Sequence, residues 1–417
     1  MPLTRDITLL VAARITRLFA YGFLSVILVL YLDAIGFDAA STGLLLTLAL
    51  AGDAAVSLWL TTAADRAGRR RMLIIGAVLM VAGGAVFAAS SDWWLLAIAA
   101  TVGVISPTGK EIGPFLSIEQ AALSEVVIAS RRTHAFAWYH VAGSLASAAG
   151  ALAGGGSVAL LRESGYAPVD AYRVLLVAYA VAGAVIGVLF LCVSPAVEAS
   201  PADRAALNRP WFGLHQSRGI VMRLSALFAL DAFAGAFIVQ SVMAYWFHVR
   251  FGASEAAIGA ILFGANLVAG LTALGAASLA SRIGLIRTMF VTHLPSNVLL
   301  CFVPFMPTLA LAVTVLIVRF SISQMDVPTR QSYTMAVVAP DERSAAAGIT
   351  TLARSAGAAI APALGGLVLG VSLAAPFVVS GGLKVVYDLL LYRGFRAIRP
   401  PEEQTPPPDA SAKIDRR

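Results

Sequence analysis

The chain has little of what soluble and disulfide-stapled proteins depend on. Only two of its 417 residues are cysteines, Cys192 and Cys301, and both lie in apolar stretches far apart in the sequence. This excludes a disulfide framework and a cysteine-based metal site. Charged residues make up 13% of the chain, whereas a soluble domain carries about 25%. We therefore expect a membrane protein.

Other absences narrow the class of function. The five histidines do not cluster, and no nucleophile–base arrangement or phosphate-cradling loop is present. We therefore predict neither an enzyme nor a protein that holds a cofactor or metal ion. The net charge of +7 would suit nucleic acid, but the basic residues gather in short segments on one side of the membrane. We therefore predict no nucleic-acid partner.

Apolar residues are abundant, at 59% of the chain with a mean hydropathy of +0.83. A helix needs about 20 mostly apolar residues to cross the hydrocarbon layer. The apolar runs predict an all-α membrane protein with twelve transmembrane helices, at about 9–32, 41–62, 72–90, 93–118, 134–160, 173–192, 223–248, 256–280, 287–306, 308–336, 344–370 and 376–394.

The distribution of Lys and Arg predicts the orientation. Most lie in segments that share one side of the membrane with both termini, and only Arg162, Arg173 and Arg250 fall on the other side. Because basic loops stay in the cytoplasm, we expect both termini there, in the cell (inner or plasma) membrane. No small-residue cleavage site follows the first apolar run, so we expect no removable signal peptide.

A long polar segment divides the spans six and six. It predicts an N-terminal six-helix bundle at 1–193, a cytoplasmic central loop at 194–222, a C-terminal six-helix bundle at 223–398 and a tail at 399–417. The tail is polar and rich in proline, so we expect it to be disordered.

The two halves repeat each other. The aligned positions include Gln120 with Gln331, Arg132 with Arg343, Gly36 with Gly252, Gly43 with Gly259, Gly68 with Gly284, and Gly154–Gly155 with Gly365–Gly366. The repeat predicts two pseudo-symmetric bundles around a central cavity. Transporters with parallel repeats have this architecture, and their substrate site lies between the halves.

The loop between the second and third spans carries a motif. Asp65, Arg66, Gly68, Arg69 and Arg70 match the pattern Gly-x-x-x-Asp-Arg-x-Gly-Arg-Arg/Lys, in which Thr61 replaces the first glycine. With twelve spans and a central loop, the chain resembles the major facilitator superfamily, and bacterial proton-coupled efflux-type members in particular.

The resemblance implies a latch. Asp65 would dock on the N-terminus of the eleventh span, near Ser344, and close the cytoplasmic side, while Gly68 would permit a tight turn. Asp65, Arg66, Gly68 and Arg69 are therefore latch candidates. The arginine run also serves as a topology signal.

Glycines mark the fifth and eleventh spans. Gly150, Gly154 and Gly155 partly match the pattern of the superfamily's antiporters, whose proline is here Ala151. The eleventh span carries Gly357, Pro362, Gly365 and Gly366. Ordinary close packing of helices and export by antiport both fit these glycines.

Ionizable residues inside spans are functional-site candidates because each is costly there. In the superfamily, spans one, four, seven and ten line the cavity. The proton-coupling candidates are Glu111, Asp326 and Asp231, and the substrate-cavity candidates are Arg17, Tyr21, Lys110, Arg319 and Gln240.

Glu119 and Arg330 align in the repeat, so we expect them to pair across the cavity mouth as a gate; the alternative is an ion pair within one half, such as Asp326–Arg330. We expect four charged or polar residues to lie outside the cavity, with Lys384 paired to Asp388. These four are Asp53, His140, Arg354 and Lys384, and Asp388 is expected to lie outside the cavity with Lys384.

The leading hypothesis is a monomeric secondary active transporter in the lipid bilayer, coupled to protons and exporting a drug-like or metabolite compound by antiport. Uptake of a small anionic solute is the alternative. A non-transporting membrane sensor or assembly protein on the same fold is a second class, which the charged stripes on the cavity spans disfavour.

Overall fold

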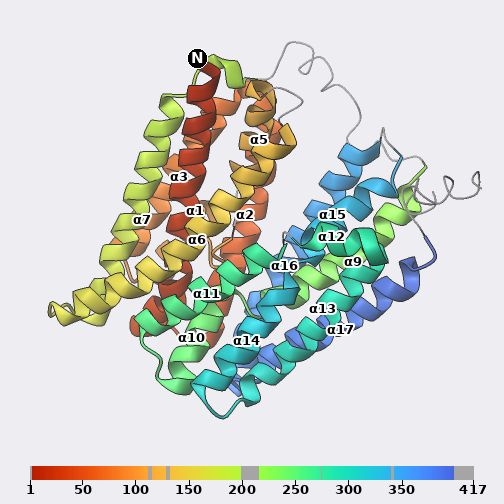
Figure 1. Ribbon diagram of the computed structural model, residues 1–417. Helices are drawn as coiled ribbons and strands as arrows, with labels where there is room; N and C mark the ends of the chain where they lie inside the picture. Colours follow the sequence, from red (N-terminus) through yellow and green to blue (C-terminus); the bar gives the residue numbers. More distant parts are fainter. Residues whose placement is uncertain are drawn as a thin grey trace, which may run out of the picture.

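The computed structural model (Figure 1) describes residues 2–110, 115–127, 132–198, 216–273, 275–339 and 342–398, and their side chains except at 2–4, 65–66, 124–125, 132–137, 277 and 344. The predicted tail at 399–417 and most of the central loop lie outside these ranges. All regular structure in the described part is helical.

Each predicted span coincides with one helix or with two consecutive helices. They are α1 (Pro2–Ala34), α2 (Ala39–Ala67), α3 (Arg69–Ala89), α4 (Trp93–Val102) with α5 (Phe115–Val126), α6 (Arg132–Glu163), α7 (Pro168–Leu191), α9 (Arg218–Ala236) with α10 (Gln240–Phe251), α11 (Glu255–Ala273) with α12 (Ala276–Ile283), α13 (Leu285–Phe302), α14 (Leu309–Ser323) with α15 (Asp326–Ala336), α16 (Arg343–Val371) and α17 (Ala375–Phe395). Short 3-10 helices lie at η2 (Pro195–Val197) and η3 (Val303–Phe305).

Eleven described segments are long and apolar enough to cross a membrane. The fourth predicted span is not among them, because α4 ends at Val102 and helix resumes at Phe115. The chain is an all-α, multi-pass membrane protein, as predicted.

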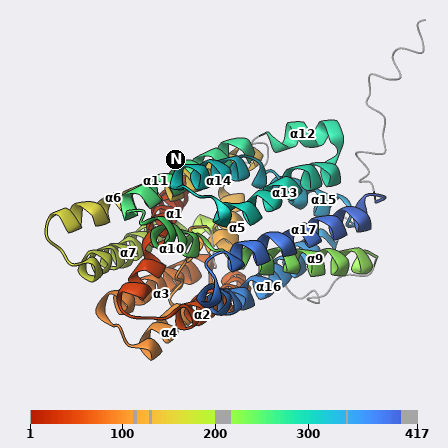
Figure 2. The ribbon, with the colours of Figure 1, turned by 90° about the horizontal axis from the view of Figure 1, so that it is seen from below.

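The helices form two bundles with equivalent packing (Figures 1 and 2). In the first, α1 packs on α6 and α7, and α3 packs on α7. In the second, α9 packs on α16 and α17, and α13 packs on α17. Each helix of one bundle thus has a counterpart with the same neighbours in the other, which is the predicted pseudo-symmetry.

The backbone repeats as well. Gly68 between α2 and α3 has φ +106°, and its counterpart Gly284 between α12 and α13 has φ +89°. Gly36 and Gly252, which are also aligned in sequence, have φ +93° and +64°. Residues with a Cβ rarely adopt this region, so the aligned glycines mark equivalent turns.

The two bundles touch through paired glycines. Where α6 crosses α11, a Cβ on Gly155 would lie 2.1 Å from the carbonyl oxygen of Glu255, and one on Gly259 would lie 2.6 Å from that of Ala151. Where α2 crosses α16, a Cβ on Gly366 would lie 2.2 Å from the oxygen of Ala39. Glycine is required at these crossings because the backbones approach too closely for any side chain.

Polar contacts join the bundles near the same crossings. Glu255 accepts hydrogen bonds from the Tyr172 hydroxyl at 2.7 Å and from Arg162 Nη1 at 3.3 Å. Tyr245 donates to Asp33 at 3.2 Å. We call the region formed by these contacts and the glycine crossings the closed end.

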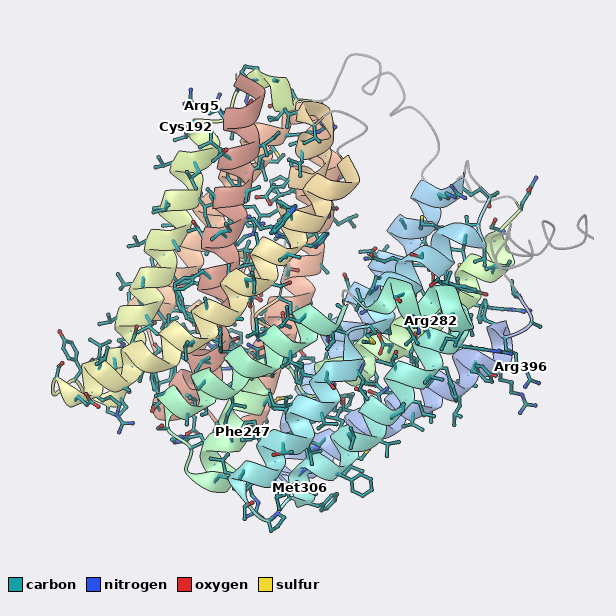
Figure 3. The ribbon with its side chains drawn as sticks, in the orientation of Figure 1. Arg5, Cys192, Phe247, Arg282, Met306 and Arg396 are labelled. Atoms are coloured by element: carbon teal, nitrogen blue, oxygen red, sulfur yellow. The ribbon has the colours of Figure 1, made fainter. Side chains whose placement is uncertain are left out.

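The bundles diverge away from the closed end, toward the end where the N-terminus lies (Figure 1). In Figure 3, Arg5 lies at the divergent end of the first bundle, with Arg282 and Arg396 at the corresponding end of the second. Phe247 and Met306 lie at the opposite end.

The closed end should open more readily without the Glu255 carboxylate. Hydrogen bonds to charged groups contribute about 1.5–3 kcal/mol, so we expect Glu255→Ala to increase the open population about tenfold to a hundredfold. Spin labels would be placed on Ser164→Cys and Ser254→Cys, with Cys192 and Cys301 replaced by serine. Pulsed electron spin resonance would then report the open population as a component at longer distance.

The matched control is Glu163→Ala, which removes an exposed carboxylate from the last residue of α6, at the closed end. It should leave the distance distribution of the labelled protein unchanged. Identical distributions in Glu255→Ala and Glu163→Ala would show that the Glu255 contacts do not hold the bundles together.

Candidate functional site

A cavity of about 340 Å³ lies between the bundles, and we call it the central cavity. Its walls include the places where spans are interrupted. Thr108 and Lys110 lie between α4 and α5, Ile238 and Val239 between α9 and α10, and Gln324 between α14 and α15. Irregular backbone at membrane depth is tolerated where it lines a cavity. The helix interruptions are therefore tolerated because they lie in the cavity wall.

Two of the breaks meet. The Ser241 amide donates to the carbonyl oxygen of Pro107 at 3.2 Å, across the bundle boundary. Beside it, Gln240 Nε2 donates to Ser25 Oγ at 2.7 Å and Gln240 Oε1 accepts from Asn266 at 3.2 Å. The Ser241–Pro107 bond satisfies a backbone donor and acceptor at the interruptions, and the two Gln240 bonds join polar side chains beside it.

Basic side chains outnumber acidic ones in the described wall of the cavity. The basic residues are Lys110, Arg319, Arg330, Arg354 and Lys384, and the acidic ones are Asp53, Asp231 and Asp326. The expectation that Asp53, Arg354 and Lys384 lie outside the cavity is therefore wrong. Helix spacing alone does not show which way the second, eleventh and twelfth spans are rotated.

Asp231 on α9 gathers most of this charge. It accepts hydrogen bonds from Arg330 at 3.1 Å, Arg354 at 3.0 Å and Lys384 at 2.5 Å. Arg330 also binds Asp326 at 3.1 Å. Asp231 is only 3% exposed, so a carboxylate charge there would be costly without these partners.

Lys110 and Arg319 differ from the other cavity cations. Among the described residues, neither forms an ion pair with a carboxylate, and Arg319 Nε is buried without a hydrogen-bond partner. Lys110 belongs to the first bundle and Arg319 to α14 of the second. The cavity therefore presents a cation from each bundle that no described acid neutralises.

The first bundle holds its own buried ion pair outside the cavity. Both terminal nitrogens of Arg17 donate to Glu119 at 2.7 Å, Tyr139 also donates to Glu119, and Arg17 and Glu119 are fully buried. Tyr21 is fully buried too and stacks on Tyr179. Arg17 and Tyr21, predicted as cavity residues, thus lie in the bundle interior.

This pair is the counterpart of Asp231–Arg330 with the signs exchanged. Arg17 and Asp231 lie on the equivalent helices α1 and α9, and Glu119 and Arg330 lie on α5 and α15. Glu119 and Arg330 do not pair with each other in this conformation, so the gate between them stays a prediction. Each charge finds a partner on a neighbouring helix of its own bundle, while the bundles diverge.

A second buried polar cluster reaches the cavity wall at His293. His293 Nδ1 is 2.7 Å from Asp388 Oδ1, and Asn297 Nδ2 donates to Asp388 Oδ2 at 2.8 Å. The predicted Lys384–Asp388 pair is wrong, because Lys384 binds Asp231. The sequence analysis missed His293 and Asn297, although both are polar residues one helical turn apart within an apolar span.

Of the remaining candidates, Gln240 and Asp326 line the cavity, while Glu111 lies outside the described residues. His140, in the first bundle, is 3.3 Å from Gln120 and 3.4 Å from Arg14, away from the cavity.

The motif loop forms hydrogen bonds with Glu198 and with the C-terminal end of α7. Gly68 ends α2 in the predicted tight turn, and the Arg69 amide donates to Glu198 at 2.7 Å. Arg70 donates to the carbonyl oxygens of Phe190 and Leu191, the last residues of α7. These arginines thus bind structural groups as well as marking topology. The side chains of Asp65 and Arg66 lie outside the described ones, so the latch stays a prediction.

Asp231 should be needed for the stability of the second bundle. Asp231→Asn would leave the buried Arg330 and the partly buried Lys384 and Arg354 without their shared carboxylate, and breaking a buried pair costs about 3–5 kcal/mol. We expect a lower midpoint of thermal unfolding in detergent. Asp170→Asn is the control, since the Asp170 side chain is 59% exposed and such pairs contribute about 0–1 kcal/mol. Equal midpoints for the two variants would contradict this role.

Comparison with known proteins agrees with this architecture. The family model described as Major Facilitator Superfamily matches residues 10–324 and 226–415. A membrane protein of Saccharomyces cerevisiae that is described as uncharacterized is 29% identical over 418 residues, covering 93% of each chain.

Solved structures share the fold at low sequence identity. The nucleoside transporter NupG superposes with a TM-score of 0.74 at 15% identity, covering 95% of this chain and 100% of that one. A D-xylose–proton symporter superposes with a TM-score of 0.72 at 15% identity, covering 93% and 97%.

Proposed function

Because the chain belongs to the Major Facilitator Superfamily, we propose that it is a secondary active transporter of a small solute that carries a negative charge. The solute binds in the central cavity between the two bundles. The bundles then rock about the closed end, so that the cavity faces one side of the membrane and then the other.

The observation that supports an anionic solute is the cavity charge. Lys110 and Arg319 face the cavity from different bundles without a described carboxylate partner. A cation at membrane depth is costly unless it is paired, and an anionic group would supply the missing partner. A solute bound by both cations would also link the two bundles, which couples its binding to their relative position.

The positive charge of the cavity favours an anionic solute over a drug-like export substrate. The glycine pattern that suggested export by antiport is accounted for by packing, since Gly150 and Gly154 lie against the backbone of α1 and Gly155 against α11. Cavity carboxylates remain proton-coupling candidates, chiefly Asp326 and Asp231. A sensor or assembly role has no use for the unpaired cations.

The membrane orientation is part of the proposal. With basic segments and both termini in the cytoplasm, the closed end faces outward and the bundles diverge toward the cytoplasm. The conformation is then inward-facing, and the latch at Asp65 would act when this side closes.

Transport in proteoliposomes tests the proposal. We expect anionic solutes to exchange across the membrane and their neutral analogues not to. Arg319→Gln should lower the rate about tenfold or more, because a charge-assisted hydrogen bond contributes about 1.5–3 kcal/mol. Arg319→Lys should retain part of the rate, since it keeps the charge but loses the planar fork.

Arg71→Gln is the control, because it removes an exposed arginine in the first turn of α3, far from the cavity wall. It should transport at the wild-type rate. Movement of neutral or cationic solutes alone, or unchanged anion transport by Arg319→Gln, would contradict the proposal. A solute that stabilises the protein without crossing the membrane would favour the sensor role.

A further inference from the structure

Four arginines gather at the divergent end of the second bundle, away from the central cavity. Arg282 lies at the end of α12, Arg287 in the first turn of α13, and Arg393 and Arg396 at the end of α17. All four are exposed, and Figure 3 shows Arg282 and Arg396 at the same end of the bundle. We call these four residues the arginine rim.

The described part of the chain does not neutralise the rim. Among the residues that the structure describes, none of the four arginines forms an ion pair with a carboxylate. Glu342, just before α16, accepts hydrogen bonds from the backbone amides of Gln216 and Ser217 at 2.7 and 2.8 Å. The rim therefore offers its positive charge to a partner outside the described chain.

The equivalent place in the first bundle is built differently. There α3 packs on α7, and Arg70 in the first turn of α3 donates to the carbonyl oxygens of Phe190 and Leu191 at the end of α7. The aligned glycines Gly68 and Gly284 make Ile286 the counterpart of Arg70, and Ile286 is buried. The arginine that joins the two helices in the first bundle is thus replaced by an apolar contact in the second, where the arginines lie outside.

Aromatic contacts fix the helices that carry the rim. Phe290 of α13 stacks on Tyr392 of α17 with ring centroids 4.5 Å apart, and each of these rings lies less than one helical turn from a rim arginine. Tyr333 of α15 donates to the carbonyl oxygen of Ile398 at 3.0 Å, which holds the end of α17. The rim is therefore carried by a fixed pair of helices.

Exposed apolar side chains continue from the rim along both helices. Helical periodicity places one set on the same face of α13 as Arg287, and this set consists of Val291, Val298 and Phe302. The set on the face of α17 that carries Arg393 consists of Val386, Leu389 and Leu390. In a bilayer these side chains meet acyl chains, so each helix presents a cation at the end of an apolar face.

We propose that the arginine rim is a binding site for an anionic phospholipid. Arg287 and Arg393 hold its phosphate, and its acyl chains lie along the apolar faces of α13 and α17. A guanidinium group binds phosphate through two parallel hydrogen bonds, and clusters of arginine at a membrane surface bind anionic lipids.

The site is independent of the proposed transport. All four arginines belong to the second bundle, so a bound lipid moves with that bundle and does not link it to the first. Binding requires neither the anionic solute nor a particular membrane orientation, because it depends only on the arginines and the apolar faces beside them.

Native mass spectrometry of the full-length protein in detergent tests the site. The protein is titrated with phosphatidylglycerol and with phosphatidylcholine of the same acyl chains. Each arginine near an anionic group contributes about fivefold to binding, so we expect phosphatidylglycerol to bind about tenfold more tightly or better. Glycerol 3-phosphate at a comparable concentration should not displace it, because it lacks the acyl chains.

The double variant Arg287→Gln/Arg393→Gln should weaken phosphatidylglycerol binding about 25-fold, from the same contribution per arginine. The matched control is Arg5→Gln/Arg71→Gln, which removes one exposed arginine each from α1 and α3 of the first bundle. It should keep the affinity of the wild-type protein.

Equal affinity for the two lipids would overturn the proposal. Equal losses in the two double variants would also overturn it, because they would show attraction to the overall positive charge of the protein. Displacement by glycerol 3-phosphate at a comparable concentration would show a site for free phosphate, to which the apolar faces contribute nothing.

Discussion

The inability of lipid to solvate charge is the constraint on which this structure depends. The buried carboxylates of Glu119, Asp326 and Asp231 each have a basic partner, and Asp231 shows this most fully, because it binds cations from α15, α16 and α17. These bonds tie α9 to three neighbouring helices. They favour a second bundle that moves as one body, since separating its helices would expose unpaired charge to a medium of low dielectric constant.

The contact between the bundles depends on small residues and not on paired charges. It relies on glycines, whose missing side chains let backbones approach at two symmetric crossings, supplemented by a few hydrogen bonds around Glu255. Among the residues that the structure describes, the only ion pair across this interface is the partly exposed Arg162–Glu255. Tightly paired charge within bundles and small residues between them together suit rigid bodies that pivot on each other.

Much of the fold could be predicted from the sequence because it depends on local composition. Hydropathy located the spans, and the aligned glycines Gly36, Gly68, Gly252 and Gly284 correctly marked equivalent turns. The interruptions near Lys110, Val239 and Gln324 were missed, because counting apolar residues over about 20 positions averages out the short polar stretches near Lys110 and Gln324 and registers no change near Val239. They become intelligible only beside the cavity, where the freed backbone groups find partners.

The sequence by itself determined the helical class, the duplication and the presence of costly charges inside the spans. Only the tertiary structure decided how those charges are used. It paired Arg17 with Glu119 inside one bundle, brought Lys384 to Asp231 rather than to Asp388, and left Lys110 and Arg319 facing the cavity. The physical reason is that spacing along a helix fixes which residues share a face. The rotation of that face, and the helix opposite it, are set by packing against the rest of the molecule.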